Sequence, residues 1–169
     1  RITTVELFEA EREIYKQLSA MKSDCDVIIN QDVWNKNKKE YLKELRAELS
    51  SEQEEFLDAI NDNRVTVLLG PGGSGKSWVT KIAGATYGLF APTARAAHVM
   101  QEYIGEEALT IHRGLLKYEL VGEAAPYDVL IIDEFSMVDS ELAHTVLKVL
   151  KNRGRLILIG DDFQLPSVG

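Results

Sequence analysis

Residues 65–77 read VTVLLGPGGSGKS, a run of apolar and β-branched residues followed at once by a glycine-rich turn. Val65–Leu69 is too apolar for a half-exposed strand, so we expect it inside a sheet covered on both faces. Gly70–Ser77 fits G-x-x-x-x-G-K-[ST] in full, and a helix is predicted from about residue 76. A strand, a glycine turn and a helix in this order form the setting in which the pattern cradles phosphate groups.

The residue types of this loop suit a triphosphate bound with a metal ion. Glycines let backbone amides turn toward phosphate oxygens, and the start of the helix adds partial positive charge. Lys76 is expected to pair with the β- and γ-phosphates, and the Ser77 hydroxyl to ligate Mg²⁺. The predicted nucleotide-binding residues are Gly70, Pro71, Gly72, Gly73, Ser74, Gly75, Lys76 and Ser77.

The rest of the chain after residue 50 alternates between strand and helix patterns. Further strands are predicted at 85–90, 128–132 and 155–159, and helices at 76–84, 94–104 and 139–151. Apolar strands that alternate with helices indicate a mainly parallel sheet in a three-layer α/β domain. Ligands of such sheets bind at the carboxyl ends of the strands, where every motif of this chain falls.

The first 50 residues have a different character. Apolar positions at helical spacing predict helices at 3–20 and 32–49, and no motif can be assigned there. Ser50 with Gln53, or Ser51 with Glu54, fits the capping-box spacing for a helix that runs to about residue 61. We therefore divide the chain into a helical N-terminal segment, 1–50, and an α/β domain, 51–169.

Two further stretches carry polar groups at strand ends. The strand VLII ends in Asp133 and Glu134, which we expect to point to different sides and so to do different work. Asp133 suits a Mg²⁺ ligand, and Glu134 suits the general base that orients and deprotonates a water molecule. After the last strand, Gln164 could contact the γ-phosphate and sense its loss; the alternative is a plain acidic turn at residues 160–162.

Bulk properties exclude several other classes of protein. The net charge of −8 argues against a protein coated in positive charge, although a local basic track remains compatible with it. No apolar run approaches the roughly 18 residues of a membrane span, so no membrane partner is expected. A single cysteine, Cys25, cannot form an internal disulfide, which fits a cytoplasmic location.

Several segments taken together resemble superfamily-1 DNA helicases of the RecD branch. They match motifs I, Ia, Ib, II and III of that family in order and spacing, over about residues 50–169. The segments are Gly70–Ser77, APTARAA (91–97), TIHR (110–113), IIDE (131–134) and GDDFQLPSVG (160–169). The resemblance implies a RecA-like fold, use of ATP and Mg²⁺, and translocation on single-stranded DNA, usually 5′ to 3′.

The resemblance also assigns roles to individual residues. Gln53 matches a glutamine that contacts adenine, although it also suits a capping-box partner. Thr93, Arg95 and His112 fall in segments that line the DNA path in relatives. A helix N-cap is the other interpretation of Thr93, and a structural role that of Arg95 and His112.

The chain departs from the family in having nothing that corresponds to motifs IV to VI. Those motifs lie on a second RecA-like motor domain, which supplies an arginine finger worth a factor of about 10³ to 10⁵ in rate. We therefore expect a fragment that binds ATP, hydrolyses it slowly and does not unwind DNA. Two alternatives stay open, a P-loop ATPase or nucleotide kinase with no DNA role, and a non-catalytic binding module.

Overall fold

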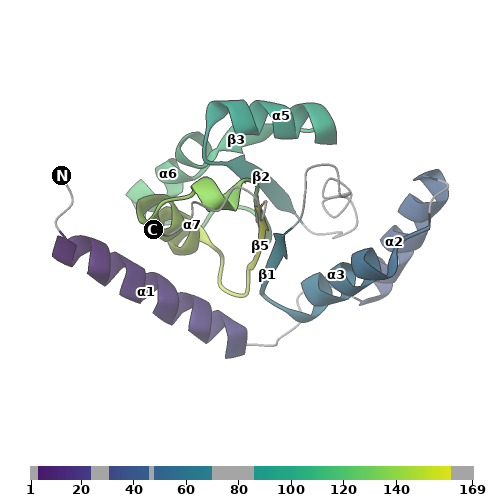
Figure 1. The fold of residues 1–169 in the computed structure, drawn as a ribbon, viewed down its shortest axis with the longest axis horizontal. Coiled ribbons are helices and arrows are strands. Elements are labelled where there is room, and N and C mark those ends of the chain that lie inside the picture. Colours follow the sequence, from purple (N-terminus) through teal and green to yellow (C-terminus); the bar gives the residue numbers. More distant parts are fainter. Residues whose placement is uncertain (1–3, 24–30, 46–47, 70–85, 161–169) are drawn as a thin grey trace.

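The computed structural model of the chain describes residues 4–23, 31–45, 48–69 and 86–160 (Figure 1). The strands in these residues are β1 (Val65–Leu69), β2 (Tyr87–Ala91), β3 (Ala108–Thr110), β4 (Val129–Ile132) and β5 (Arg155–Gly160). The helices are α1 (Thr4–Ser23), α2 (Gln31–Leu45), α3 (Ser51–Asp62), α5 (Ala94–Ile104), α6 (Ile111–Val121), α7 (Ser140–Val149) and the 3-10 helix η2 (Phe135–Met137). None of these helices has the length and apolarity that a membrane span requires.

The five strands form one sheet in the order β1-β5-β4-β2-β3. Every neighbouring pair is parallel, with Leu68 opposite Ile159 in β1 and β5, and Ile131 opposite Ile157 in β4 and β5. Parallel neighbours need crossover connections, and the helices between the strands supply them. The expected parallel α/β sheet is confirmed. The expectation that Val65–Leu69 is covered on both faces was wrong, because β1 is at the edge of the described sheet and Val67 and Leu69 are 52% and 53% exposed.

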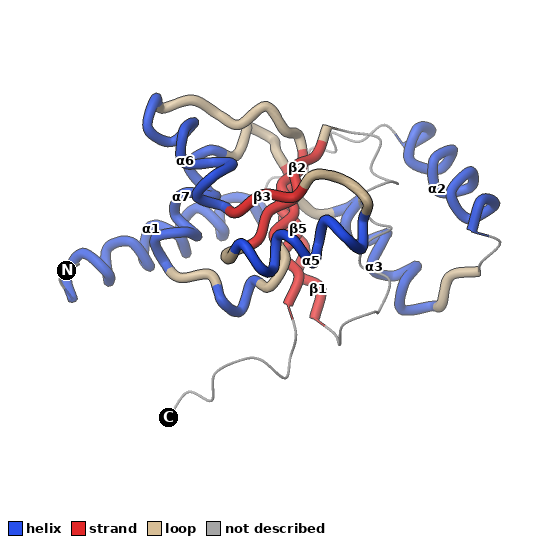
Figure 2. Tube along the Cα trace, turned by 90° about the horizontal axis from the view of Figure 1, so that it is seen from above, coloured by secondary structure: helices blue, strands red, loops and turns tan. Residues whose placement is uncertain are grey.

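Alternate residues of each strand point to opposite faces, which gives the domain two separate cores. Ile131 and Ile157 join a cluster with residues of α2, α3 and α5, whereas Leu130 and Leu158 join one with residues of α1, α6 and α7. Figure 2 shows α1, α6 and α7 on one side of the sheet and α2 and α3 on the other. These layers confirm a three-layer α/β architecture.

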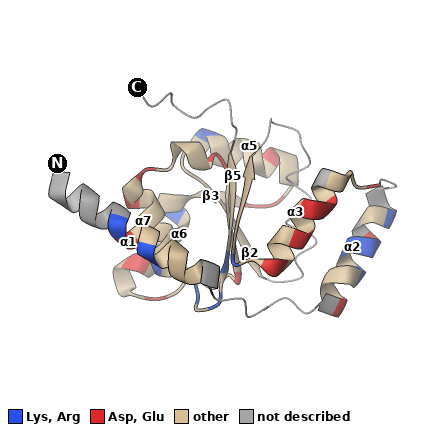
Figure 3. Ribbon diagram, turned by 60° about the horizontal axis from the view of Figure 1, so that its bottom comes forward, with Lys and Arg blue, Asp and Glu red and all other residues tan. Residues whose placement is uncertain are grey.

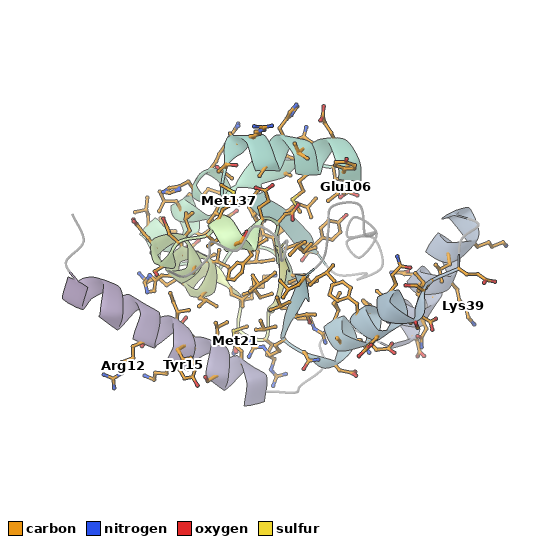
Figure 4. The ribbon with its side chains drawn as sticks, viewed as in Figure 1. Arg12, Tyr15, Met21, Lys39, Glu106 and Met137 are labelled. Atoms are coloured by element: carbon orange, nitrogen blue, oxygen red, sulfur yellow. The ribbon has the colours of Figure 1, made fainter. Side chains whose placement is uncertain are left out.

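The two N-terminal helices pack against the two cores. Trp34 of α2 is 1% exposed and packs in the cluster that contains Leu57 and Ile60 of α3. On α1, Met21 points toward the sheet while Arg12 and Tyr15 point outward (Figure 4). The two predicted N-terminal helices are confirmed, although residues 48 and 49 are not helical as expected. The predicted helix 76–84 lies outside the described residues, and the division of the chain at residue 50 stays a prediction.

The sequence patterns did not predict β3 and α6. A three-residue strand is too short to show an alternation, and Gly114 weakens the helical pattern of α6. The structure explains this glycine, because a Cβ at Gly114 would collide with the ring of Phe90. The close approach of α6 to the sheet therefore requires a glycine at position 114, although glycine has a low helix propensity.

Asp128 lies at the amino-terminal edge of the sheet, where the strands begin, and joins the start of β4 to two other segments of the chain. One carboxylate oxygen accepts hydrogen bonds from the hydroxyl and backbone N–H of Thr86, at 2.6 and 3.3 Å. The other accepts from Nζ of Lys151 at 2.9 Å. The Thr86 hydroxyl, followed by the Lys151 ammonium, lowers the pKa of Asp128. Asp128 thus ties the start of β4 to the segments before β2 and β5.

Replacing Asp128 by Asn should destabilise the fold by about 1 kcal/mol at neutral pH, since charge-assisted hydrogen bonds are lost at a partly exposed site. The folded-state pKa lies below the ordinary value of 3.8, so this contribution is complete above pH 3.8 and disappears as the pH falls through the folded-state pKa. Urea unfolding of both proteins at several pH values measures the difference.

The exposed Glu123→Gln serves as the control for loss of a carboxylate, and it should leave the unfolding free energy unchanged. A difference between wild type and Asp128→Asn that stays constant through pH 3 would contradict the assignment.

Candidate active site

The carboxyl ends of the strands form one edge of the sheet, from which the predicted site segments leave. β1 ends at Leu69, directly before the glycine-rich loop, and β5 ends at Gly160, four residues before Gln164. β5 lies between β1 and β4, so the ends of β1 and β4 are about 10 Å apart, two strand spacings. Gly70–Ser77 and Gln164 themselves lie outside the described residues, and their roles stay predictions.

Asp133 is held at the end of β4 by backbone and side-chain hydrogen bonds. Its N–H donates to the carbonyl of Phe90 in β2 at 2.9 Å, so the ladder continues one residue beyond the strand. Its Oδ1 accepts from the N–H of Glu134 at 2.9 Å. This bond uses one lone pair of the carboxylate and leaves others for a ligand. The half-buried Asp133 is therefore fixed in place and still able to bind a metal ion.

Glu134 has a left-handed backbone, with φ 50° and ψ 43°. Its carbonyl accepts from the N–H of Met137 at 2.9 Å, which closes the turn into η2. We had expected strand alternation to send the two carboxylates to different sides. Strand alternation does not apply to these two residues, because β4 ends at Ile132. The chain changes direction at Glu134 instead, through its left-handed backbone. A non-glycine residue in this conformation carries strain, which collects at functional sites.

Thr93 caps α5, as the structural interpretation of this residue predicted. Its hydroxyl oxygen accepts from the N–H of Ala96 at 3.2 Å. The hydroxyl proton remains available to donate, so the cap does not prevent a contact with a ligand. Arg95 is exposed at the second position of the helix, next to this N-terminus.

A second helix N-terminus lies beside the first. β2 and β3 are neighbours, with Ala91 opposite Thr110, and Thr110 caps α6 by accepting from the N–H of Arg113 at 3.1 Å. His112 and Arg113 are both exposed in the first turn of α6. Sequence reasoning did not single out Arg113, and the signal that could have found it is the capping threonine before an apolar helical pattern.

Gln53 is a capping-box residue of α3, as one of its two interpretations predicted. Its Oε1 accepts from the N–H of Ser50 at 2.9 Å, and its own N–H donates to the Ser50 hydroxyl oxygen at 3.3 Å. The alternative box of Ser51 and Glu54 is not formed. The bond to Ser50 orients the carboxamide, with its oxygen toward the backbone and its NH₂ group turned away from it.

Fold and site together define a RecA-like α/β domain with functional groups at the carboxyl edge of a parallel sheet. Residues 48–169 match the family model described as AAA domain, and the chain belongs to this family. The resemblance to RecD-like superfamily-1 helicases is confirmed by its relatives.

Three of these relatives are two ATP-dependent DNA helicases and a subunit of the RecBCD enzyme. The ATP-dependent RecD2 DNA helicase of Deinococcus radiodurans is 41% identical over 75% of this chain. The RecBCD enzyme subunit RecD of Haemophilus influenzae is 30% identical over 60%, and the ATP-dependent DNA helicase dda of phage T4 is 31% identical over 66%. The chain spans 19%, 17% and 30% of the length of these three relatives.

Substitutions at Glu134 should show the backbone strain directly. Glu134→Gly should raise the free energy of unfolding by about 0.5–1 kcal/mol, because glycine adopts the left-handed conformation without a Cβ clash but loses more entropy on folding. Glu134→Asn should gain less, since asparagine tolerates the conformation only partly.

Glu134→Gln is the matched control that removes the charge and keeps the strain, so its stability should equal that of the wild type. Denaturant unfolding measures the series. A glycine variant less stable than the glutamine variant would contradict the prediction, because the strain relieved at residue 134 would then be smaller than the entropy that glycine loses on folding.

Proposed function

We propose that this chain is the first motor domain of a RecD-like helicase, and that its carboxyl sheet edge binds and hydrolyses ATP with Mg²⁺. The observation that carries the proposal is the strand order. It brings the strand that precedes the glycine-rich loop within one strand of the strand that ends in Asp133 and Glu134. A triphosphate in a loop after β1 would then lie opposite the two acids.

In this proposal each residue has one task. The backbone of 70–77 and Lys76 hold the phosphates, while Ser77 and Asp133 hold the metal. Glu134 orients and deprotonates the attacking water, and Gln164 reports whether the γ-phosphate is present. When bound, Mg²⁺ neutralises charge on the phosphate oxygens.

The described residues suit Mg²⁺ bound mainly through its nucleotide. Within residues 4–23, 31–45, 48–69 and 86–160, no three His, Cys, Asp or Glu side chains form a group that could hold a metal ion. Mg²⁺ in nucleotide sites keeps several waters and takes only one or two protein oxygens besides the phosphates. Asp133, anchored through one lone pair and open at the others, fits this requirement.

Single-stranded DNA is the proposed partner of the adjacent α5 and α6 N-termini. Two helix N-termini side by side favour backbone phosphates, and the exposed Arg95 and Arg113 add positive charge. The Thr93 hydroxyl and His112 supply further hydrogen-bonding groups. The ribbon in Figure 3 has one blue stretch on α5, whereas α3 has several red stretches, and acidic residues would not attract a phosphate backbone.

Motion along DNA, in the 5′ to 3′ direction, would require the second motor domain. The cleft between the two domains would open and close with the ATP cycle, and the second domain would add the arginine that this site lacks. Alone, the 169 residues should bind ATP and hydrolyse it slowly.

Two substitutions separate catalysis from binding. Lys76→Ala should weaken Mg·ATP about 10- to 100-fold, because charged hydrogen bonds to phosphate are lost. Glu134→Gln should keep the affinity and lower single-turnover hydrolysis about 10²- to 10⁴-fold. Calorimetry and quench-flow measure the two quantities. Full activity of the Lys76→Ala protein would favour a non-catalytic binding module.

A DNA titration distinguishes a helicase domain from an ATPase with no DNA role. We expect oligo-dT to stimulate ATP turnover, and Arg95→Ala to weaken binding and reduce the slope of log K against log salt by about 0.7. Arg12→Ala, which removes an exposed arginine from α1, is the matched control and should change neither quantity. Turnover unaffected by DNA at every salt concentration would contradict the DNA role.

A further inference from the structure

Arg155, the first residue of β5, is a buried charged side chain with no place in the proposed catalytic set. It is 3% exposed. Its guanidinium donates to the backbone carbonyl of Ile60, and to that of Asn61 at 2.8 Å. Burial lowers the pKa of the guanidinium and the nearby Asp62 carboxylate raises it, but an arginine remains charged in either case. A buried cation thus meets carbonyls at the C-terminal end of α3.

This contact is one of several that anchor the last turn of α3. The final carbonyls of a helix have no partner inside the helix and carry its negative partial charge. Besides the two that Arg155 binds, the carbonyl of Ala59 accepts from the Thr66 hydroxyl at 3.3 Å and from the Asn63 side-chain amide at 2.8 Å. The end of α3 is therefore bonded to both β1 and β5, the strands that precede the glycine-rich loop and Gln164.

The opposite end of the same helix carries Gln53. Only residues 63 and 64 separate α3 from β1, so the C-terminal end of the helix lies beside the start of the strand and its N-terminus points away from that start. Twelve helical residues and five strand residues span similar lengths, about 18 and 17 Å. The N-terminus of α3 is thereby brought to the level of the carboxyl edge of the sheet, and Figure 3 shows the helix running at an angle to the strands. The orientation of α3 sets where the Gln53 carboxamide lies.

The capping bond leaves the Gln53 amide with a defined polarity. Oε1 accepts from Ser50 and has a second lone pair, while the NH₂ group retains its donors. Such an amide can accept from the 6-amino group of adenine and donate to N7. Guanine has a 6-oxo group in place of the amino group, so the Gln53 Oε1 and the guanine O6, both hydrogen-bond acceptors, would face each other.

We infer that Arg155 is a positioning residue for base recognition: by fixing the C-terminal end of α3 to β5, it holds the Gln53 carboxamide where an adenine can be told from a guanine. The inference rests on the proposed function, because it assumes that the nucleotide binds at the carboxyl edge. It adds a determinant at the far end of the helix, remote from the phosphates.

The experiment measures dissociation constants of ATP, GTP and inorganic tripolyphosphate, each with Mg²⁺, for the complete 169-residue chain. Gln53→Ala should lower the preference for ATP over GTP about tenfold, and Arg155→Met about fivefold, with tripolyphosphate binding unchanged in both. The Gln53→Ala/Arg155→Met double variant should be no less selective than Gln53→Ala alone, because both changes act through one amide. Arg155→Lys, which retains a donor and the charge, should restore part of the preference.

Two threonine variants guard against a general loss of folding. Thr66→Val removes another anchor of the same helix end, and should lower the preference in the same direction if Arg155→Met does not fold. Thr145→Val is the matched control: Thr145 is equally buried and donates to Glu119 at 2.6 Å on the other face of the sheet, so the preference should not change.

The outcomes separate the inference from the proposal beneath it. A wild-type chain that binds neither ATP nor tripolyphosphate would overturn the proposed function. A wild type that prefers ATP, with the same preference in Arg155→Met and Thr66→Val, would overturn the positioning role alone. If Arg155→Met weakens the binding of ATP, GTP and tripolyphosphate equally, the positioning role is also overturned, because Arg155 would then only stabilise the fold.

Discussion

Burial of a parallel sheet on both faces is the constraint from which the rest of this structure follows. Strands covered on two sides are mostly apolar along their length, as β4 is, so most polar groups lie where the strands end. Parallel strands all end at one edge. The acid pair and the two capped helix starts are therefore gathered along the edge at which β1 also ends, although Leu69 and Glu134 are 65 residues apart in the chain.

Local backbone chemistry then sets the direction of individual groups. Glu134 turns the chain out of β4 in a left-handed conformation, and the carboxylate of its neighbour Asp133 accepts the N–H at that turn. Thr93, two residues after β2, and Thr110, the last residue of β3, cap the helices that follow these strands. Each of these devices satisfies a backbone group that would otherwise be unpaired at the sheet edge.

The sequence predicted most of this architecture because long apolar strands and glycine-punctuated motifs leave strong signals. Val129–Ile132 and Arg155–Ile159 could be recognised from composition alone, and the Ser50–Gln53 box from its spacing. The three-residue β3 could not, because it is too short to show an alternation, and α6 could not, because close packing against Phe90 requires a glycine inside the helix. Neither could the partner of Arg155, because a side chain bonded to carbonyls about 95 residues away leaves no local pattern.

The central claim is that one triphosphate lies between the glycine-rich loop and the acid pair. A crystal structure of the chain with Mg²⁺ and a non-hydrolysable ATP analogue tests it most directly. The account predicts phosphates against the backbone of residues 70–77, with Asp133 facing the metal ion directly or through one of its waters. A nucleotide bound elsewhere, or an Asp133 carboxylate remote from the metal ion, would contradict it.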